Sequence, residues 1–170
     1  MSGHVNFLGI PVEGRITPGH QRVKQRPLSD LEPLLRAVLD DSSIKAFGWM
    51  QYTPYFNDGD PCVFEVCSPW FLTVDDPDPD DVEDPYEYEV HARRGHPSIG
   101  AWKYSGNWPN RVPIPGSYVG PDVDRFERVK ALADALDSCA FEDVLLEAFG
   151  DHAKVTIRSS GITVDFYSHD

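Results

Sequence analysis

Several features that would assign the sequence to a broad class at once are missing. No apolar run approaches the roughly 20 residues that a membrane-spanning helix needs, so we expect no membrane partner. Cysteines are few: Cys62, Cys67 and Cys139 form an odd, sparse set that favours reduced thiols over a disulfide framework. The opening residues, MSGHVNFLGIPVEG, lack the basic start and long apolar stretch of a signal peptide. We therefore expect a cytoplasmic protein.

Catalytic motifs are missing as well. The chain contains no G-x-S-x-G, no P-loop pattern, no H-E-x-x-H and no G-x-G-x-x-G. It also contains no internal repeat. The sequence therefore favours a protein that is not an enzyme and that carries no cofactor.

Basic residues are scarce: 15 Lys and Arg face 28 Asp and Glu, for a net charge of −13. Direct nucleic-acid binding is disfavoured, because phosphate binding depends mainly on Lys and Arg. A protein partner with a basic surface, or a metal cation, would instead be attracted. The charge is concentrated in one stretch that has nine acids and no base: Asp75, Asp76, Asp78, Asp80, Asp81, Glu83, Asp84, Glu87 and Glu89.

What the sequence does contain is enough apolar material for one folded domain. Its 170 residues are 41% hydrophobic and 12% aromatic, so the chain can bury a substantial core. We expect a single domain, 1–170, with an N-terminal arm at 1–27, an acidic loop at 75–85 and a Pro-rich loop at 95–121. The arm carries four bases and no acid between Gly14 and Pro27, so we expect it to fold against the acidic loop.

Three helices are predicted. Ser29 and Glu32 form a capping-box pattern ahead of leucines at helical spacing, which places Pro33 in the tolerant first turn. Apolar periodicity predicts a second helix over 122–137. A shorter helix over 141–149 should end at Gly150, the usual C-terminal stop.

The strands are predicted as hairpins. The stretches 47–56 and 63–74 alternate, and the NDGD between them is typical of a tight turn. YEYEVHAR, residues 86–93, also alternates and predicts a further strand. At the C-terminus, Val155 and Ile157 should share a face with Ile162, Val164 and Phe166 across an SSG turn. The predicted fold class is α+β, an antiparallel sheet of hairpins with three helices packed on it.

The densest run of unusual residues is QYTPYFNDGDPC, 51–62. Asn57, Asp58 and Asp60 could hold a cation, while Tyr52 and Tyr55 present an aromatic surface to a ligand. Turn chemistry alone explains Asn57, Asp58 and Gly59, so a structural turn is the simpler interpretation. It leaves four residues unexplained: Gln51, Thr53, Tyr55 and Asp60.

Two further patterns resemble metal-binding motifs but depart from them at important positions. Asp76, Asp78, Asp80 and Glu87 match positions of a calcium loop, but Asp81 stands where that loop needs glycine. Two cysteines and two histidines, Cys62, Cys67, His91 and His96, resemble a zinc finger in spacing. Cys62 and Cys67 lie five residues apart in a predicted strand, so their side chains should point to opposite faces. We therefore assign no metal ligand.

Aromatic residues crowd the Pro-rich loop. Trp102 and Trp108, with Tyr104 and Tyr118, could form a binding surface, because such residues anchor interfaces; ordinary packing of the loop explains them equally well. The partner-binding candidates are therefore Tyr52, Tyr55, Asn57, Asp58, Asp60, Asp76, Asp78, Asp80, Asp81, Trp102 and Trp108.

The pattern W-x-Q-Y-T-P-Y-F-N-D-G-D-P-C-x-F-x-V, residues 49–66, resembles a segment of uncharacterised proteins of bacteria and their phages. The C-terminal stretch 148–170 is similar to the end of such proteins. The resemblance implies no activity and no catalytic residue. It makes a bacterial or phage accessory protein the expected setting.

Three hypotheses about function follow. The first is a protein-binding or accessory protein, such as an inhibitor or immunity-type partner, that acts through the acidic loop and the aromatic-rich loop. The second is a small metal-assisted hydrolase built on Asp58, Asp60 and a histidine. The third is a structural subunit whose edge strands are buried between copies in a larger assembly. The clustered charge and the missing catalytic motifs favour the first.

Overall fold

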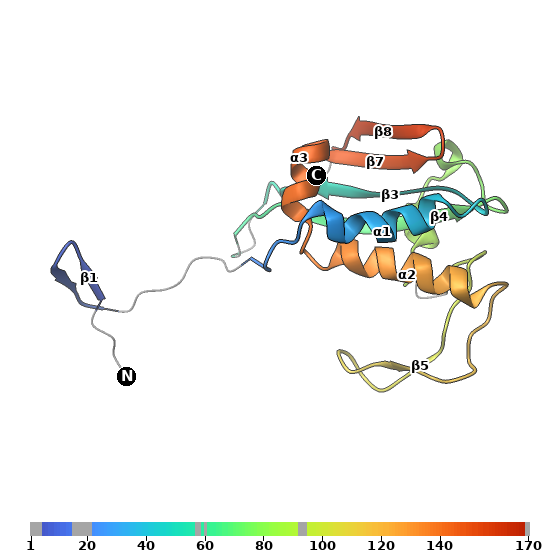
Figure 1. Ribbon diagram of the computed structural model, residues 1–170, viewed down its shortest axis with the longest axis horizontal. Coiled ribbons are helices and arrows are strands. Elements are labelled where there is room, and N and C mark those ends of the chain that lie inside the picture. The colour runs from blue at the N-terminus through green and yellow to red at the C-terminus, as the bar shows by residue number, and fades with distance from the viewer. Residues whose placement is uncertain (1–4, 15–21, 57–58, 60, 92–94, 169–170) are drawn as a thin grey trace.

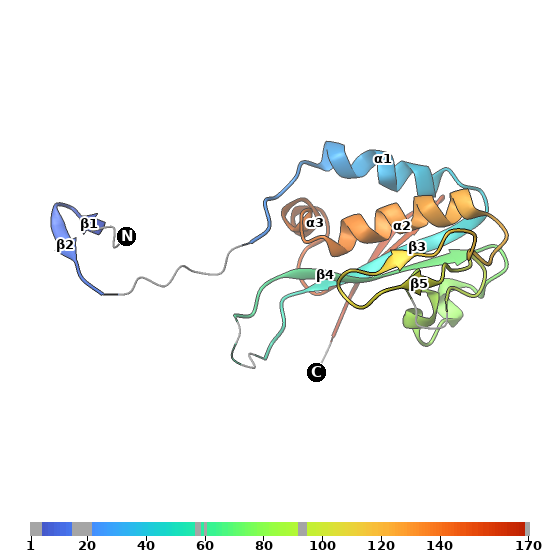
Figure 2. The same ribbon diagram turned by 90° about the horizontal axis from the view of Figure 1, so that it is seen from below.

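A computed structural model describes residues 5–14, 22–56, 59, 61–91 and 95–168 of the chain. Its centre is an antiparallel four-stranded sheet in the order β4-β3-β7-β8. The strands are β3 (Ile44–Tyr52), β4 (Glu65–Thr73), β7 (Ala153–Arg158) and β8 (Gly161–Phe166). Three helices, α1 (Leu28–Leu39), α2 (Val123–Asp137) and α3 (Glu142–Phe149), lie on one face of this sheet (Figures 1 and 2). The predicted α+β class is confirmed.

Two small hairpins complete the strands. One pairs β1 (Val5–Phe7) with β2 (Ile10–Val12), and Figure 1 shows it apart from the helices and the main sheet. The other pairs β5 (Tyr104–Ser105) with β6 (Val112–Pro113) inside the Pro-rich loop. The sequence did not predict this second hairpin, because its strands are only two residues long.

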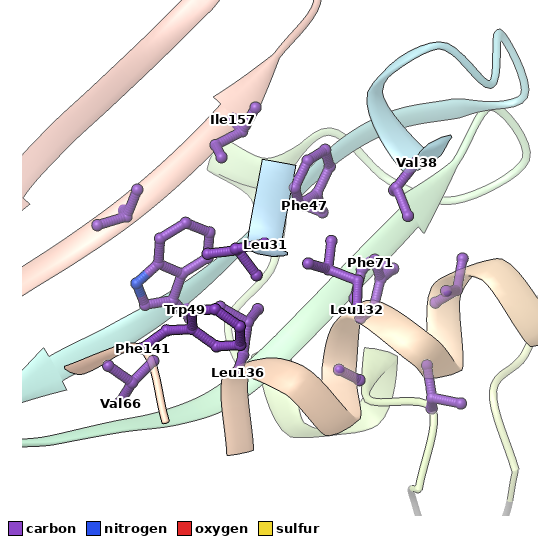
Figure 3. Packing of buried hydrophobic residues seen from close by; sticks show 14 of the residues in the cluster. Leu31, Val38, Phe47, Trp49, Val66, Phe71, Leu132, Leu136, Phe141 and Ile157 are labelled. Carbon is purple, nitrogen blue, oxygen red and sulfur yellow. The ribbon is translucent and has the colours of Figure 1, made fainter. Parts of the chain in front are cut away.

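The core lies between the helices and the sheet. Trp49, Phe47 and Phe71 of the central strands are almost fully buried, and the rings of Phe47 and Phe71 stack with centroids 5.9 Å apart. Leu31 of α1 and Leu132 of α2 close over them (Figure 3). Burying side chains of this size supplies most of the driving force for folding.

The opposite face of the sheet carries a smaller cluster of Ala46, Trp70 and Leu72. Gly48 makes room for it, because a Cβ there would lie 2.0 Å from the Val155 carbonyl oxygen and 2.7 Å from the Trp70 ring. The covering segment contains two short 3-10 turns, η1 (Pro79–Asp81) and η2 (Pro85–Tyr88). Figure 2 shows it on the side of the sheet away from the helices.

The predicted strand at 86–93 is wrong. Residues 85–88 form η2, because Pro85 fixes its own φ and the Asp84 side chain accepts a hydrogen bond from the Tyr86 amide. Alternation alone cannot distinguish this turn from a strand. Ala92 and Arg93 lie outside the described residues.

The capping box at Ser29 is also wrong. Helix α1 begins at Leu28 after Pro27, no side chain caps its first turn, and Pro33 lies well inside it. The preceding segment is fixed by tertiary contacts instead: the Arg26 amide donates to the Ala140 carbonyl, 2.7 Å away.

The basic arm does not fold against the acidic loop in its described part. Arg22 pairs with Glu142 (3.3 Å) and Asp143 (2.8 Å) at the start of α3. Carboxylates in the first turn of a helix are themselves attractive partners for an arginine fork. Residues 15–21 lie outside the described chain.

The first predicted hairpin and the last are both present, but their tips differ. The SSG turn joins β7 to β8 as expected, with Ile157 opposite Ile162. Strand β3 ends at Tyr52 and β4 begins at Glu65, so neither Pro54 nor Pro61 lies in a strand. The described residues on either side of the tip, 53–56 and 61–64, are irregular.

Candidate functional site

Gln51 is one of the four residues in the 51–62 stretch that turn chemistry leaves unexplained. Its side chain is completely buried and accepts a hydrogen bond from the Trp49 indole nitrogen, 2.9 Å away. Its amide nitrogen donates to the carbonyls of Leu145 (3.0 Å) and Gly150 (2.6 Å). Gln51 therefore ties the sheet to the C-terminal part of α3 and to Gly150, which ends the helix. It is a structural residue.

Thr53 and Tyr55 fix the tip of the same hairpin to the two residues just before β7. Both the amide and the hydroxyl of Thr53 donate to the Asp151 carboxylate, at 2.8 and 2.7 Å. Tyr55 stacks on His152 with ring centroids 4.6 Å apart, and Tyr55 remains 59% exposed. These contacts explain two more of the residues that turn chemistry left unexplained.

Tyr52 lies at the base of this tip and packs on Tyr167, with centroids 5.4 Å apart. Burial raises the pKa of Tyr52 to about 12. Asn57, Asp58 and Asp60 lie outside the described residues. The cation site proposed on them therefore stays a prediction, and the structure gives no geometry for it.

Asp76 is the anchor of the acidic loop. One carboxylate oxygen accepts from the Thr73 amide (2.7 Å), the Thr73 hydroxyl (3.1 Å) and the Ser98 hydroxyl (2.6 Å). The Lys45 ammonium donates to its backbone carbonyl. A carboxylate held in this way closes the turn after β4. Asp76 therefore has a structural role, and its place among the binding residues stays a prediction.

The other acids face solvent from an ordered framework. Asp78 and Asp84 accept hydrogen bonds from the amides of Asp80 and Tyr86 and so cap η1 and η2. Val82 and Tyr88 pack on the smaller cluster around Trp70. We call the exposed carboxylates of this segment the acidic ledge; they are Asp75, Asp78, Asp80, Asp81, Glu83, Asp84 and Glu87.

Among the described residues, one base forms ion pairs with the ledge. The Arg158 guanidinium lies 3.9 Å from Asp78 and 3.5 Å from Asp80. Both carboxylates are well exposed, so these pairs contribute little to stability. Most of the ledge's negative charge is left facing solvent.

Ser98, His96 and Asp76 lie together in a way that superficially resembles a catalytic triad. Nδ1 of His96 accepts the amides of Ser98 (3.2 Å) and Ile99 (3.1 Å), so Nε2 carries the proton and donates to the Phe71 carbonyl, 2.7 Å away. Asp76 bonds to Ser98, not to His96. Because neither ring nitrogen is free to take a proton from Ser98, the group cannot act as a triad. Burial also lowers the pKa of His96.

The histidines and cysteines of the zinc pattern are not brought together. His91 contacts Asp134 (3.0 Å) on α2, while His96 is buried against the carbonyl of Phe71. Cys62 is exposed and lies outside β4. Among the described residues, no three His, Cys, Asp or Glu side chains are grouped so that they could hold a metal ion.

The two tryptophans of the Pro-rich loop have different environments. Trp102 is half-buried and packs on Tyr118, whose hydroxyl donates to the Ile99 carbonyl at 2.6 Å. Trp108 is 87% exposed between β5 and β6. Of this pair, Trp108 alone offers its ring to a partner.

Beside Trp102 the surface is hollowed. A cavity of about 360 Å³ is lined by Gly95, His96, Pro97, Gly100, Ala101, Val119, Gly120 and Pro121. His96 is the one ionisable side chain among the described residues of this lining, and both its nitrogens are already bonded. The described lining therefore presents no free reactive group.

Sequence reasoning missed a pair of interacting carboxylates. Glu89 follows η2, and burial together with the nearby Asp137 raises its pKa to about 7. The pKa of Asp137 is raised as well, mainly by burial. One carboxylate oxygen of Glu89 is buried with no hydrogen-bond partner in the described structure. The two residues are far apart in the chain, so no local pattern could have revealed them.

Among the described residues, no helix is long and apolar enough to span a bilayer. Comparison with known proteins adds no assignment. No family model, curated protein or solved structure matches this chain. The candidate functional surface is therefore defined by geometry and charge alone: the acidic ledge and the exposed ring of Trp108.

Proposed function

We propose that this protein binds a partner protein with a basic surface, using the acidic ledge as the main contact and Trp108 as a second one. The resemblance of residues 49–66 to bacterial and phage proteins favours an accessory role, such as an inhibitor or immunity-type partner. The proposal rests chiefly on one observation: the exposed acids are carried by an ordered segment packed on the sheet.

An ordered framework matters because binding is weakened by the entropy lost when loops become fixed. The ledge is held in place before any partner arrives. Asp78 and Asp84 cap its two turns, and Val82 and Tyr88 bury their side chains against the sheet. The carboxylates between them are thus displayed at fixed spacing.

Charge favours a basic partner. Complementary fields accelerate encounter and suppress association with partners of the wrong sign. Among the described bases, only Arg158 forms ion pairs with the ledge, and these reach only Asp78 and Asp80. The acids at 81–87 therefore direct their field outward.

Trp108 adds an apolar contact, which the charged residues of the ledge do not provide. Exposed tryptophan is enriched among the residues that contribute most to interfaces. The hairpin that carries it is braced where the Arg111 guanidinium lies over the Tyr104 ring, 5.6 Å from its centroid. A ring fixed on such a hairpin can fill a partner's apolar pocket at low entropic cost.

The test is a matched pair of charge variants. The ledge variant replaces four exposed acids: Asp75→Asn, Asp81→Asn, Glu83→Gln and Glu87→Gln. The control removes the same charge from exposed acids elsewhere: Asp40→Asn, Asp124→Asn, Glu127→Gln and Glu147→Gln. Affinity for an octa-lysine peptide is measured by calorimetry at low and at physiological salt, with octa-glutamate as the reference peptide.

We expect the ledge variant to bind octa-lysine at least about tenfold more weakly than the control variant, with a shallower salt dependence. Equal weakening in both variants would mean that only net charge matters, and the proposed surface would be wrong. Unchanged binding in the ledge variant would remove the ledge from the function altogether.

A further inference from the structure

The outer strand of the main sheet, β8, is left uncovered on its helix side by the residues that the structure describes. Across the β7–β8 hairpin, Val155 and Ile157 are at most 2% exposed, whereas their partners Val164 and Ile162 are 47% and 54% exposed. Phe166 is 75% exposed. Figure 1 shows β8 at the border of the sheet, with no strand beyond it.

The backbone of β8 offers hydrogen bonds along the same border. The Tyr167 amide donates to the His152 carbonyl, 2.8 Å away, so residue 167 faces β7. Successive residues of a strand direct their N–H and C=O groups to opposite sides. Ile162, Val164 and Phe166 therefore direct theirs outward, away from β7. The three residues with exposed apolar side chains also carry the open backbone groups.

We propose that a second copy of this chain pairs antiparallel with β8, with the two-fold axis passing through Val164. Val164 then lies opposite Val164 of the second copy, and Ile162 lies opposite its Phe166. All three outward-facing residues of each copy form ladder hydrogen bonds, and their apolar side chains meet on one face. A two-fold interface of this kind is self-complementary, as isologous contacts must be.

The charge on β8 favours this register over the registers shifted by one residue in either direction. β8 carries one charged residue, Asp165. With the axis through Val164, Asp165 lies opposite the Thr163 hydroxyl of the second copy, which can donate to it. Moving the axis to Asp165 would set two carboxylates opposite one another, which is unfavourable. Moving it to Thr163 would leave Phe166 opposite Ser160 in the turn and lose ladder bonds.

An extended peptide from another protein could also extend a free edge. A second copy fits better because the same three residues supply both sides of the ladder and the apolar strip. This interface uses no residue of the acidic ledge, so its test and the test of the proposed function are independent.

Sedimentation velocity of the full chain over a concentration series tests the proposal. We expect a reversible monomer–dimer equilibrium. Val164→Lys places a charge in the apolar strip and should raise the dimer dissociation constant at least about tenfold. Val164→Pro removes only an outward N–H and should weaken the dimer while leaving β7 pairing intact. Circular dichroism confirms that each variant is folded.

The register is tested at Thr163, on the opposite face of the strand. Thr163→Asp faces Asp165 of the second copy and should weaken the dimer, whereas Thr163→Lys should preserve or strengthen it. A wild-type chain that stays monomeric at every concentration overturns the proposal. A dimer that is indifferent to both Val164→Lys and Thr163→Asp also overturns it, because its interface then lies elsewhere.

Discussion

The two edges of the four-stranded sheet are built in opposite ways. On β4, Ser68 and Pro69 together face Trp49, so the strand bulges, and Ser68 has a positive φ of 54°. A bulge and a proline both discourage a further strand from pairing. The β8 edge has neither, and its residues pair with β7 without interruption.

The β4 edge is also covered. His96 donates to the Phe71 carbonyl, and Ser98 bonds to Thr73 at 2.9 Å, so the 95–100 segment caps outward groups of this strand. No comparable segment among the described residues covers β8, whose side chains are all exposed. The described chain thus protects one edge and leaves the other open. The proposed pairing of β8 would explain this contrast, since free edges otherwise promote aggregation.

A large effect is expected from removing the anchor of the covered edge. Asp76→Ala deletes an acceptor of three hydrogen bonds and leaves the Thr73 amide and the Ser98 hydroxyl without that partner. Hydrogen bonds to charged groups and unsatisfied buried donors suggest a loss of about 3 kcal/mol in the free energy of unfolding. Urea denaturation measures it.

The neighbouring Asp75→Ala is the matched control, because the Asp75 side chain is exposed. It should change the free energy of unfolding by less than about 0.5 kcal/mol. If the two alanine variants were equally stable, Asp76 would not hold the segment over β4. Amide hydrogen exchange should also quicken along β4 in Asp76→Ala and not along β8.

A smaller effect should appear as a pH dependence of the covered edge. Glu89 has a pKa raised to about 7 by burial, with contributions from Asp137 and Asp84, against an ordinary value of 4.5. A carboxyl whose pKa is higher in the folded state favours folding when protonated. Its contribution is therefore complete below about pH 4.5 and is lost as the pH rises through about 7.

Glu89→Gln removes this dependence. At pH 8 the variant should be more stable than the wild type by about 1 kcal/mol, a value reduced because solvent screens a partly exposed carboxylate. At pH 4 the two proteins should be equally stable. Thermal unfolding followed across this range checks the prediction, and a wild-type advantage at pH 8 would contradict it.

Many of the elements that form the sheet and its helix layer were predicted from the sequence. Alternation predicted β7 and β8 with Ile157 and Ile162 on one face, and periodicity predicted α2 and α3 closely. Those elements are continuous and locally consistent, so local patterns suffice. The sequence could not show that β8 lies outside the helix layer, because that depends on where three separate helices dock.

The site was predicted less well, for a similar reason. The acids of the 75–89 stretch look alike in the sequence, yet Asp76 is a structural anchor while Asp81 faces solvent. Turn chemistry left Gln51 unexplained, and it is a buried hydrogen-bonding residue. Such distinctions depend on partners distant in the chain, including Ser98 and Leu145, which no local spacing reveals.

The smallest effect is expected at Ile162, which lies opposite the core residue Ile157. Ile157 on β7 is 2% exposed and Ile162 on β8 is 54% exposed. Ile157→Ala should cost about 2–5 kcal/mol, as large-to-small changes in a core do. Ile162→Ala should cost less than about 1 kcal/mol when measured on the monomer, since little of its surface leaves water on folding.

Measuring both variants at two protein concentrations tests whether β8 pairs with a second copy. Only the folded chain can pair through β8, so pairing adds stability by mass action as the protein concentration rises. The loss in free energy of unfolding caused by Ile162→Ala, relative to the wild type, should therefore grow between low-micromolar and hundred-micromolar protein. The loss caused by Ile157→Ala should grow far less. If Ile162→Ala loses the same free energy of unfolding at both concentrations, β8 remains unpaired. The two edges would then differ in structure, but the open edge would not serve as an interface between copies.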